Sequence, residues 1–566
     1  MRSGERLAVI DLGSNSFRLV VFMTGDGSWR RTDEIYEPVR IGEGLAASGR
    51  LGEEPMRRAL ATLDVFDHFC RAAGLHGETV DALATSAIRD AENAAGFLAL
   101  ARERTSLPIR VLSREQEARY GYLAAVNSTT LTDGCVLDLG GGSLQLVRVA
   151  ERIAQELGSW RLGAVRMSER FLPANGPAKR RQIEELREHV AGELQRAEWL
   201  SHAGSRLVGI GGTVRNLAAA VQRASGLPSG GGVQAATVSG EALEELIERL
   251  AALPARERSS VAGVKPARAD LILAGAIVVQ GALLAGGFES LEATEAGLRE
   301  GVFFERLLTG SGMRAKRVST GSVGSGMRAK RVSTGSVGSG MRAKRVSTGS
   351  VDRDPPLFAD LRRTSVLNLA AQYRPDMAHT DHVAALALAM FDELARLGLH
   401  AGDRVERELL WAACMLHDIG MSVDYDDHHK HSRYLILNGG LPGYSPIEVA
   451  IIAQAARYHR KGMPDPGPLG ALFGPGDAAR LDRCAVLLRL AEDLERSRDQ
   501  LVRATRFTLA GASRGKGGAQ ADTNGEGGEI ELRLIADGES AVPRWAASRE
   551  SELFARAFHR ELLVAA

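Results

Sequence analysis

The chain has 566 residues and a formal net charge of +1, with 44% apolar and 25% charged residues. Single hydrophobic cores rarely grow beyond about 300 residues, so the length predicts several domains. The composition is that of an ordinary soluble globular protein. A net charge so close to zero gives no whole-chain argument for an anionic partner, and we expect no nucleic acid among the partners.

Four cysteines lie far apart in the sequence and form no C-x-x-C pair. This pattern is typical of a reduced, cytoplasmic setting. We expect no signal peptide, because the first apolar strand follows the N-terminus almost directly. We also expect no membrane partner, because no apolar stretch reaches the roughly 18 residues that a spanning helix needs.

Strand and helix patterns alternate along the first 309 residues. We expect strands at residues 7–10, 17–22, 82–84, 109–112, 134–139, 144–150 and 206–210. We expect helices at residues 54–73, from residue 115 and at residues 181–199. The alternation predicts an α/β architecture, which we divide into a subdomain I at residues 1–130 and a subdomain II at residues 131–309.

A basic tandem repeat follows. Three copies of Gly-Ser-Gly-Met-Arg-Ala-Lys-Arg-Val-Ser-Thr-Gly-Ser-Val run from Gly310 to Val351. Each copy holds three basic residues and no acidic one, so the repeats carry +9 and leave −8 for the rest of the chain. The Gly- and Ser-rich composition predicts a disordered linker over residues 310–355. It serves as a tether or, in a second hypothesis, as a basic brush that gathers a polyanionic substrate.

The remaining residues change from helices to strands. Helical spacing of apolar residues recurs at residues 361–372, 381–397, 404–417, 446–458 and 478–500, which predicts an all-α domain over residues 356–503. Residues 504–566 are expected to form a small α+β domain. Its strands lie at 505–510 and 529–536 around a glycine-rich loop at 511–528, and a helix covers residues 548–564.

Two acidic glycine loops are the most informative motif. Asp11-Leu-Gly-Ser-Asn-Ser16 and Asp138-Leu-Gly-Gly-Gly-Ser143 each follow a short apolar run. Glycine and serine in such a turn let backbone N–H groups converge on an anion. The aspartate is then placed to hold Mg²⁺ beside the bound phosphate. Two such loops indicate a duplicated phosphate clamp.

The paired loops resemble the actin, sugar kinase and heat-shock ATPase superfamily, which implies two actin-like α/β subdomains that face each other across a phosphate cleft. More narrowly, the chain resembles the exopolyphosphatase/guanosine pentaphosphate phosphatase (Ppx/GppA) family in its long form. Motifs in the family's order carry this resemblance. They are the two acidic loops, Ala84-Thr-Ser-Ala-Ile-Arg89, Glu115-Gln-Glu-Ala-Arg119, Gly209-Ile-Gly-Gly-Thr213, Gly297-Leu-Arg-Glu-Gly301, His417-Asp-Ile-Gly420, His429-Lys-His-Ser432 and Arg457-Tyr-His-Arg-Lys461.

The resemblance implies roles for residues in the cleft. Asp11 and Asp138 would hold Mg²⁺, or Mn²⁺ in its place, and Glu117 would be the catalytic base that activates water. Substrate oxygens would be bound by the loops and by one cation, namely Gly13, Ser14, Asn15, Arg89, Gly140, Gly141, Gly142, Ser143, Gly211, Gly212 and Thr213. Without the resemblance, the sequence pattern favours a surface glutamate at Glu117, paired with Arg114 or Arg119.

One catalytic position departs from the family pattern. The second loop usually continues to a glutamate that helps to hold the metal ion or the attacking water, and this chain has Gln145 there. A glutamine keeps one carbonyl oxygen but cannot act as a base. The chain is therefore either slow, or dependent on Glu117 alone, or inactive.

The helical region resembles the HD domain, in which His, His-Asp and a later Asp bind a divalent metal ion. The resemblance implies a second metal site at His382, His417 and Asp418, with Glu492 or its neighbour Asp493 as the fourth ligand. A structural alternative makes His417 a core histidine bonded to Asp418. A basic group would line a passage for polyphosphate or form a solvated surface, and it comprises His429, Lys430, His431, Arg457, His459, Arg460 and Lys461.

The sequence as a whole therefore predicts an exopolyphosphatase that releases orthophosphate from the ends of inorganic polyphosphate. The first alternative is a guanosine pentaphosphate (pppGpp) phosphohydrolase, because the same cleft accommodates a 5′-triphosphate. The second is a sensor that binds polyphosphate or the alarmone without turnover, because of Gln145. The resemblance also implies a homodimer.

Overall fold

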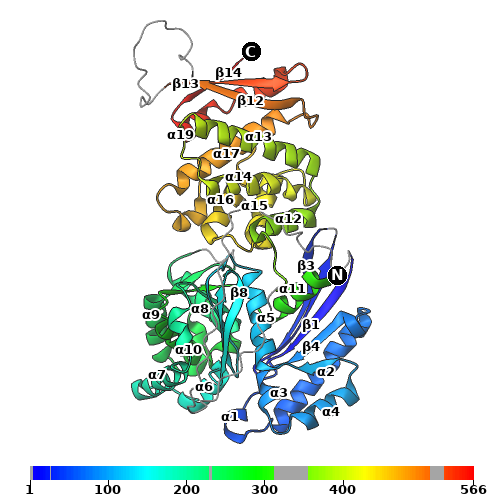
Figure 1. The fold of residues 1–566 in the computed structure, drawn as a ribbon, viewed down its shortest axis with the longest axis vertical. Helices are drawn as coiled ribbons and strands as arrows, with labels where there is room; N and C mark the ends of the chain where they lie inside the picture. Colours follow the sequence, from blue (N-terminus) through cyan, green and yellow to red (C-terminus); the bar gives the residue numbers. More distant parts are fainter. Residues whose placement is uncertain (1–3, 26, 228–231, 311–354, 510–527, 566) are drawn as a thin grey trace, which may run out of the picture.

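The computed structural model describes residues 4–25, 27–227, 232–310, 355–509 and 528–565. Nearly all of the basic repeat and of the glycine-rich loop predicted at residues 511–528 therefore lie outside the described residues. Along the long axis, two α/β subdomains lie side by side at one end, a helical domain follows, and a small sheet covers the other end (Figure 1). None of the described helices is both long enough and apolar enough to cross a membrane.

Subdomain I is built on a five-stranded sheet in the order β3-β2-β1-β4-β5. Strand β1 pairs antiparallel with β2 and parallel with β4. The strands are β1 (Arg6–Leu12), β2 (Phe17–Thr24), β3 (Trp29–Glu37), β4 (Val80–Ala84) and β5 (Ile109–Val111). The helices are α1 (Leu45–Ser48), α2 (Glu53–Ala72), α3 (Ser86–Asp90), α4 (Ala94–Arg104) and α5 (Arg114–Val126).

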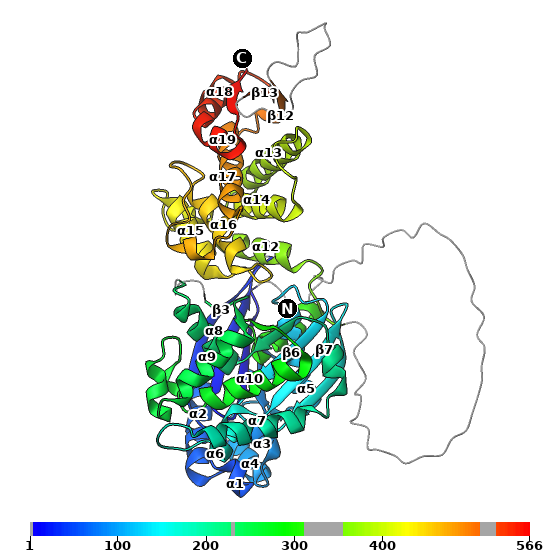
Figure 2. The same ribbon diagram turned by 90° about the vertical axis from the view of Figure 1, so that its left-hand side faces the viewer.

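Subdomain II repeats this core around a six-stranded sheet in the order β10-β11-β9-β6-β7-β8. Strand β6 pairs antiparallel with β7 and parallel with β9, as β1 does with β2 and β4. The strands are β6 (Gly134–Leu139), β7 (Leu144–Ala150), β8 (Ile153–Trp160), β9 (Leu207–Ile210), β10 (Thr237–Ser239) and β11 (Ser290–Ala293). The helices are α6 (Ala164–Phe171), α7 (Arg180–Leu194), α8 (Gly212–Ala224), α9 (Gly240–Ala251) and α10 (Ile272–Gly286), which lie together in Figure 2.

Two helices join the subdomains. Helix α5 and helix α11 (Leu298–Gly310) pack on each other, and their apolar residues share one core with the inner faces of both sheets. The two helices approach so closely that a Cβ at Gly301 would collide with the backbone of Tyr120. This packing fixes one end of α5 and one end of α11 at the junction between the sheets.

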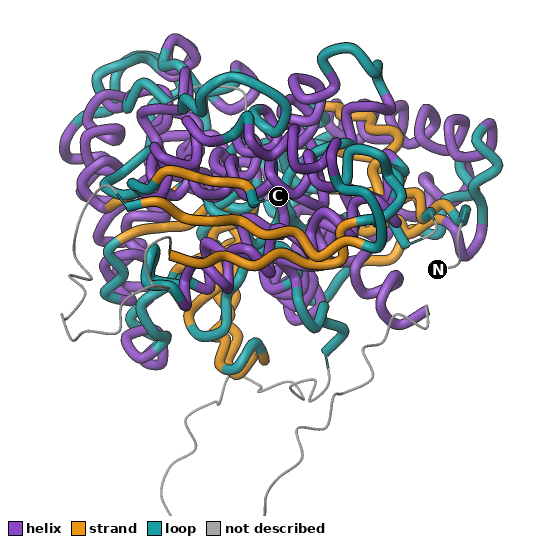
Figure 3. Tube along the Cα trace, turned by 90° about the horizontal axis from the view of Figure 1, so that it is seen from above, coloured by secondary structure: helices purple, strands orange, loops and turns teal. Residues whose placement is uncertain are grey.

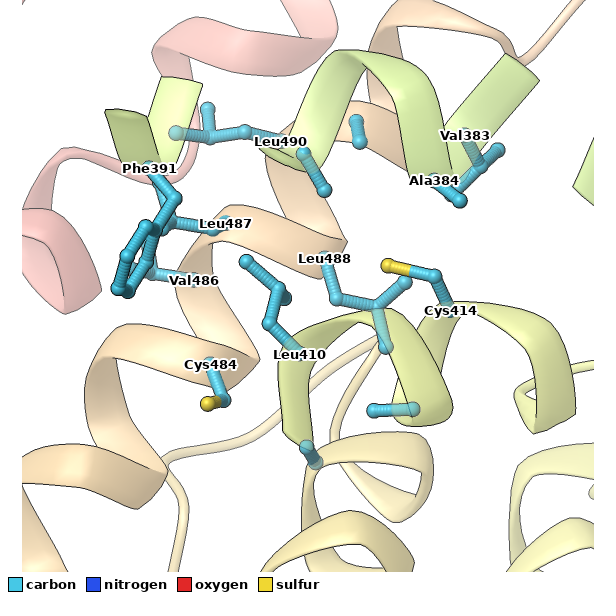
Figure 4. Packing of buried hydrophobic residues seen from close by; sticks show 14 of the residues in the cluster. Val383, Ala384, Phe391, Leu410, Cys414, Cys484, Val486, Leu487, Leu488 and Leu490 are labelled. Carbon is cyan, nitrogen blue, oxygen red and sulfur yellow. The ribbon is translucent and has the colours of Figure 1, made fainter. Parts of the chain in front are cut away.

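The helical domain contains α12 (Leu361–Tyr373), α13 (Met377–Arg396), α14 (Arg404–Leu416), α15 (His428–Gly439), α16 (Pro446–Arg457) and α17 (Asp477–Leu494). Buried side chains of α13, α14 and α17 interdigitate at its centre (Figure 4). All five predicted helices are present, whereas α15 was not predicted. The domain is docked on subdomain I through Phe358, whose ring stacks on Trp29 with centroids 5.2 Å apart.

The C-terminal region forms a three-stranded sheet of β12 (Val502–Leu509), β13 (Glu529–Ala536) and β14 (Glu561–Val564), with α18 (Ala541–Ser548) and α19 (Ser551–Phe558). The strands run across the top of the helical domain (Figure 3), with which they share one hydrophobic core. The helix predicted over residues 548–564 is wrong at its end. His559 adopts a left-handed φ of 55°, α19 stops, and β14 pairs parallel with β13.

These elements confirm the fold class predicted from the sequence. Two actin-like α/β subdomains with a shared core topology precede an all-α domain and a small α+β region. In both subdomains the central parallel strands end at the same edge of the sheet, which is where α/β proteins bind ligands. The acidic glycine loops lie at this edge.

Candidate active site

The two acidic glycine loops fold as the same tight turn. In the first, the Gly13 N–H donates to the Ser16 carbonyl over 3.2 Å, and in the second the Gly140 N–H donates to the Ser143 carbonyl over 3.0 Å. Each loop connects two antiparallel strands, β1 to β2 and β6 to β7. The duplication inferred from the sequence is therefore present in the backbone.

The loops touch each other across the junction of the subdomains. Ser14 Oγ lies 3.0 Å from Ser86 Oγ, and a Cβ at Gly142 would meet both hydroxyl groups. A side chain at this position would have to displace the Ser86 hydroxyl group. Beside the contact lies a small pocket, lined from subdomain I by Ser14 and Gly42 and from subdomain II by Gly142 and Arg166, among others.

Asp138 is enclosed by two close approaches of the backbone. A Cβ at Gly211, which has a φ of 99°, would lie 3.4 Å from Asp138 Oδ1, and one at Gly121 would lie 3.3 Å from Oδ2. The left-handed φ and the limited space both favour glycine at position 211. The loop Gly209–Thr213, which we call the third loop, thus packs on Asp138 of the second loop. Helix α5 packs on the other side of this aspartate.

Three carboxyl groups influence one another at this junction, where Glu117 is buried and Asp11 and Asp138 are half-buried. Burial, followed by the negative charges of Glu117 and Asp11, raises the pKa of Asp138 to about 7. Burial also raises the pKa values of Asp11 and Glu117 against the lowering effect of neighbouring arginines. Carboxylate oxygens are the ligands that Mg²⁺ prefers, and a divalent cation would relieve their mutual repulsion. Asp11 and Asp138 therefore fit the metal role expected of them.

Glu117 is held by Arg89. The Nη1 group of Arg89 donates to Glu117 Oε2 over 2.6 Å and to the Leu112 carbonyl over 3.0 Å. The Nε and Nη2 groups of Arg89 are buried and have no hydrogen-bond partner among the described residues. Such unpaired donors are costly unless a ligand satisfies them. Arg89 is thus placed to hold Glu117 on one side and an anion on the other.

Sequence reasoning missed four arginines, of which Arg18, Arg268 and Arg299 act on Asp11 and Arg215 acts on Asp138. Arg299 donates to Asp11 Oδ2 over 3.2 Å. Burial, followed by the charge of Arg299, lowers the pKa of Arg215 to about 10, and Arg18 and Arg268 contribute to this shift. The four arginines come from β2, α8, the short turn Pro266–Arg268 and α11. We call Arg18, Arg215, Arg268 and Arg299 the arginine cluster.

A sequence signal existed for part of the arginine cluster. Arg299 belongs to the motif Gly297-Leu-Arg-Glu-Gly301, to which no role was given, and Arg18 and Arg215 lie two positions beyond the first and third loops. Arg268 has no such signal.

A second group of arginines surrounds Asp90 at the end of α3. Arg114, Arg161 and Arg166 place guanidinium nitrogens 3.4–3.5 Å from its carboxylate, and Arg89 Nε lies 3.7 Å away. Arg161 and Arg166 belong to subdomain II, so Asp90 links the two subdomains. One carboxylate facing four guanidinium groups leaves an excess of positive charge next to Glu117.

Gln145 lies opposite Asp138 in the β6–β7 register. Its Nε2 donates to Ser143 Oγ over 2.8 Å, and its Oε1 is buried without a hydrogen-bond partner in the described part of the chain. Thr213 Oγ1 is likewise buried and unpaired there. The departure from the family pattern thus lies directly beside the carboxylates, at the position where the family has its glutamate.

In the helical domain the structure does not bring His382 to the other expected ligands. His382 Nε2 lies 2.9 Å from the Val502 carbonyl oxygen, where it caps the start of β12. His379, nearly one turn earlier on α13, takes the expected place and lies 2.9 Å from Glu492 Oε2. Glu492 rather than Asp493 reaches His417, over 3.3 Å. The histidine spacing alone did not distinguish the two faces of α13.

The structure also differs from the basic passage expected from the sequence, because two of its histidines are buried. His429 and His459 are 2% and 1% exposed. Burial lowers the pKa of His429 to about 4 and that of His459 to about 3, so neither ring carries a positive charge at neutral pH. Lys430, Arg460 and Lys461 are exposed, and His431 and Arg457 are half-buried. The cationic part of this surface is therefore smaller than the sequence indicated.

Comparisons with known proteins agree with this architecture. The model of the Ppx/GppA phosphatase family matches residues 20–310, and that of the Ppx/GppA phosphatase domain III matches residues 361–517. A crystal structure of the Aquifex aeolicus family member is 29% identical, covers 54% of this chain and 98% of its own, and has a TM-score of 0.47. An exopolyphosphatase from Cytophaga hutchinsonii is 22% identical, with coverage of 54% and 98% and a TM-score of 0.50.

The first family match spans both α/β subdomains and so includes the second and third loops, Arg89, Glu117 and the whole arginine cluster except Arg18. The second match spans the helical domain. The chain belongs to the Ppx/GppA phosphatase family.

Proposed function

We propose that the cleft hydrolyses the terminal phosphoanhydride bond of inorganic polyphosphate and releases orthophosphate in a Mg²⁺-dependent reaction. The observation that carries the proposal is the juxtaposition of the arginine cluster with the carboxyl groups of Asp11, Asp138 and Glu117. Guanidinium groups neutralise the oxygens of a phosphate chain, and phosphoryl transfer depends mainly on such positioning and charge neutralisation. The name of the Cytophaga hutchinsonii structure supports the choice of polyphosphate.

Within the proposed site, each group has one task. Glu117 takes the proton from the attacking water, because burial raises its pKa toward the range in which a carboxylate is an effective base. Arg89 binds phosphoryl oxygens through its Nη2 group, which has no hydrogen-bond partner among the described residues. Gly141 and Gly142 donate no backbone hydrogen bond in the described part of the chain, so their N–H groups are available to the same oxygens.

Mg²⁺ held by Asp11 and Asp138 would neutralise negative charge on the phosphoryl oxygens. In the described structure Arg299 already pairs with Asp11, so positive charge reaches this carboxylate from α11. Asp138 has no hydrogen-bonded cation of its own among the described residues. Asp138 therefore depends more strongly than Asp11 on a bound cation.

Hydrolysis of pppGpp at its 5′ end is the alternative reaction, since the same residues would bind a 5′-triphosphate. The arginine cluster satisfies either polyanion. A sensor that binds without turnover is the third reading, and it rests on Gln145. The substitutions below separate enzymatic turnover from binding.

Replacing the proposed base tests the catalytic assignment. We expect Glu117→Gln to lower kcat for polyphosphate hydrolysis by about 10²- to 10⁴-fold, the contribution typical of a general base, with a much smaller change in KM. Steady-state orthophosphate release measures both constants. Glu115→Gln is the matched control, because Glu115 is exposed in the same first turn of α5 and should retain wild-type kcat. A kcat for Glu117→Gln within a few-fold of wild type would remove Glu117 from the mechanism.

Restoring the family residue tests the sensor reading. Gln145→Glu adds a carboxylate beside Asp138, where it can hold Mg²⁺ or the attacking water, and Ser143 Oγ can then donate to it. We expect Mg²⁺-dependent turnover to rise by at least an order of magnitude, read as orthophosphate release per chain. Gln155→Glu, on the neighbouring strand β8 and exposed, is the control. Binding of polyphosphate with no release by either form would establish a sensor.

The raised pKa of Asp138 predicts how stability depends on pH. Between about pH 4 and pH 7 the folded metal-free chain keeps a proton that the unfolded chain has released, so its stability falls as the pH rises, by up to about 1.4 kcal/mol per pH unit for this group. Mg²⁺ should therefore stabilise the fold more at pH 8 than at pH 5. Urea unfolding with Mg²⁺ or chelator measures this. Asp138→Asn should flatten the decline, and an unchanged decline would refute the assignment.

A further inference from the structure

The arginines around Asp90 form a site that the proposed reaction does not yet use. Arg89 Nε, at the end of α3, and Arg114 Nη2, at the start of α5, lie 3.7 and 3.5 Å from Asp90 Oδ1. Arg161 Nε, just after β8, and Arg166 Nη2, on α6, lie 3.4 and 3.5 Å from Asp90 Oδ2. We call these four arginines the second arginine group.

Asp90 fills the second arginine group only in part. Bonds between a guanidinium and a carboxylate group are typically about 2.7–2.9 Å long. Every nitrogen of the group lies farther than this from the Asp90 oxygens, although the Asp90 side chain is only 9% exposed. Among the described residues, Arg166 alone donates a hydrogen bond to Asp90, over 3.5 Å. The space between the four guanidinium groups is therefore wider than one carboxylate requires.

The charges in this space are also unbalanced. Arg89 holds Glu117 as well, whereas the other three arginines have no carboxylate except Asp90 within 4 Å in the described part of the chain. Glu115 and Glu169 act on the group only from beyond this distance. Arg89 Nη2 is buried and makes no hydrogen bond to the described residues. A bound anion would satisfy this donor and balance the excess of positive charge.

The second arginine group adjoins the place where a phosphate would react. Arg89 approaches Glu117 through Nη1 and Asp90 through Nε, so one guanidinium joins the proposed base to the group. Arg166 Nε donates to the Gly142 carbonyl over 3.3 Å and so contacts the second acidic glycine loop. The small pocket beside this loop is lined by Arg166 and Gly142, among others. A phosphate held by the loop therefore lies next to the group.

The group is separate from the arginine cluster described above. The cluster acts on Asp11 and Asp138, and none of its members lies within 4 Å of the Asp90 carboxylate among the described residues. Two sets of guanidinium groups thus serve one reaction centre. Hydrolysis divides a phosphate chain into two anions, and the two sets offer a separate place to each.

We propose that the second arginine group is a site for a single phosphate group beyond the position of hydrolysis, and that Asp90 occupies it as a competing anion. The inference rests on the proposed phosphatase reaction, which supplies the ligand as released orthophosphate or as the neighbouring phosphate of the chain. A phosphate group has more oxygens than a carboxylate and carries up to two negative charges. It can therefore bond several guanidinium groups at once at normal lengths.

Asp90 gives the site its reversibility. Four guanidinium groups without an opposing carboxylate would hold a phosphate tightly and slow its departure. Asp90 lowers this affinity, because its charge repels the incoming anion, and it restores the ion pairs when the phosphate leaves. Arg161 and Arg166 belong to subdomain II and Asp90 to subdomain I, so the same exchange keeps the two subdomains linked.

Binding of inorganic phosphate to the full-length chain tests the site without any turnover. Isothermal titration calorimetry in chelator measures the affinity. We expect Asp90→Asn to bind phosphate about tenfold more tightly than wild type, and Arg161→Gln and Arg114→Gln to bind it about tenfold more weakly. Arg170→Gln is the matched control and should bind as wild type does, because Arg170 is exposed on α6 and its guanidinium lies over Phe171.

The opposite signs of these changes separate a binding role from a structural one. A phosphate held at the glycine loops contributes equally to all the variants, and a general loss of structure would weaken binding in each of them. Arg161 is 63% exposed, so Arg161→Gln should remain folded even if Asp90→Asn does not, and urea unfolding checks both. Arg161→Gln and Arg114→Gln with the affinity of Arg170→Gln would overturn the site. A folded Asp90→Asn that binds no more tightly than wild type would overturn the role of Asp90.

Steady-state kinetics with Mg²⁺ distinguishes the two sources of the phosphate. If the ligand is released orthophosphate, Arg161→Gln should weaken product inhibition by orthophosphate about tenfold and leave KM for long-chain polyphosphate unchanged. If it is the neighbouring phosphate of the chain, KM should rise by about the same factor. No change in either constant would overturn a role of the site in turnover. A wild-type chain that binds phosphate but hydrolyses no substrate would refute the proposed function and leave the site intact.

Discussion

The convergence of three carboxyl groups at one junction is the constraint on which the phosphatase half of the molecule depends. Asp11 and Asp138 end equivalent strands of two related sheets, and Glu117 reaches them from α5, which is wedged with α11 between those sheets. Desolvation, and after it their mutual repulsion, disfavours ionisation and raises the pKa of Asp138 to about 7. Arginines from four separate elements and a divalent cation offset this cost, so a fold that assembles these carboxylates also assembles a site for a polyanion.

The histidines of the helical domain are held differently from the carboxylates of the phosphatase half. The backbone carbonyl three residues earlier fixes the ring orientation of His417, His428 and His459. The three carboxyl groups are instead brought together from two subdomains.

Much of this was predictable from local sequence. The acidic loops, the alternation of strands and helices and the helical periodicity after residue 356 are local patterns, and the elements they predicted are present. The predictions that failed concern residues whose positions depend on contacts between distant parts of the sequence. His382 and His379 lie on one helix, and only the packing of α13 against α17 shows which ring meets Glu492. The arginine cluster likewise joins residues nearly 300 positions apart, and β14 exists only because β13 offers it an edge.

The most direct test of the central claim is orthophosphate release from long-chain polyphosphate and from pppGpp, measured side by side with Mg²⁺ and with chelator. The account predicts release that requires Mg²⁺ and is faster on polyphosphate, because the converging carboxylates need a divalent cation and the arginine cluster can hold several phosphates at once. Faster release from pppGpp would transfer the function to alarmone turnover. Tight binding of either polyanion without any release would contradict the claim that the cleft is catalytic.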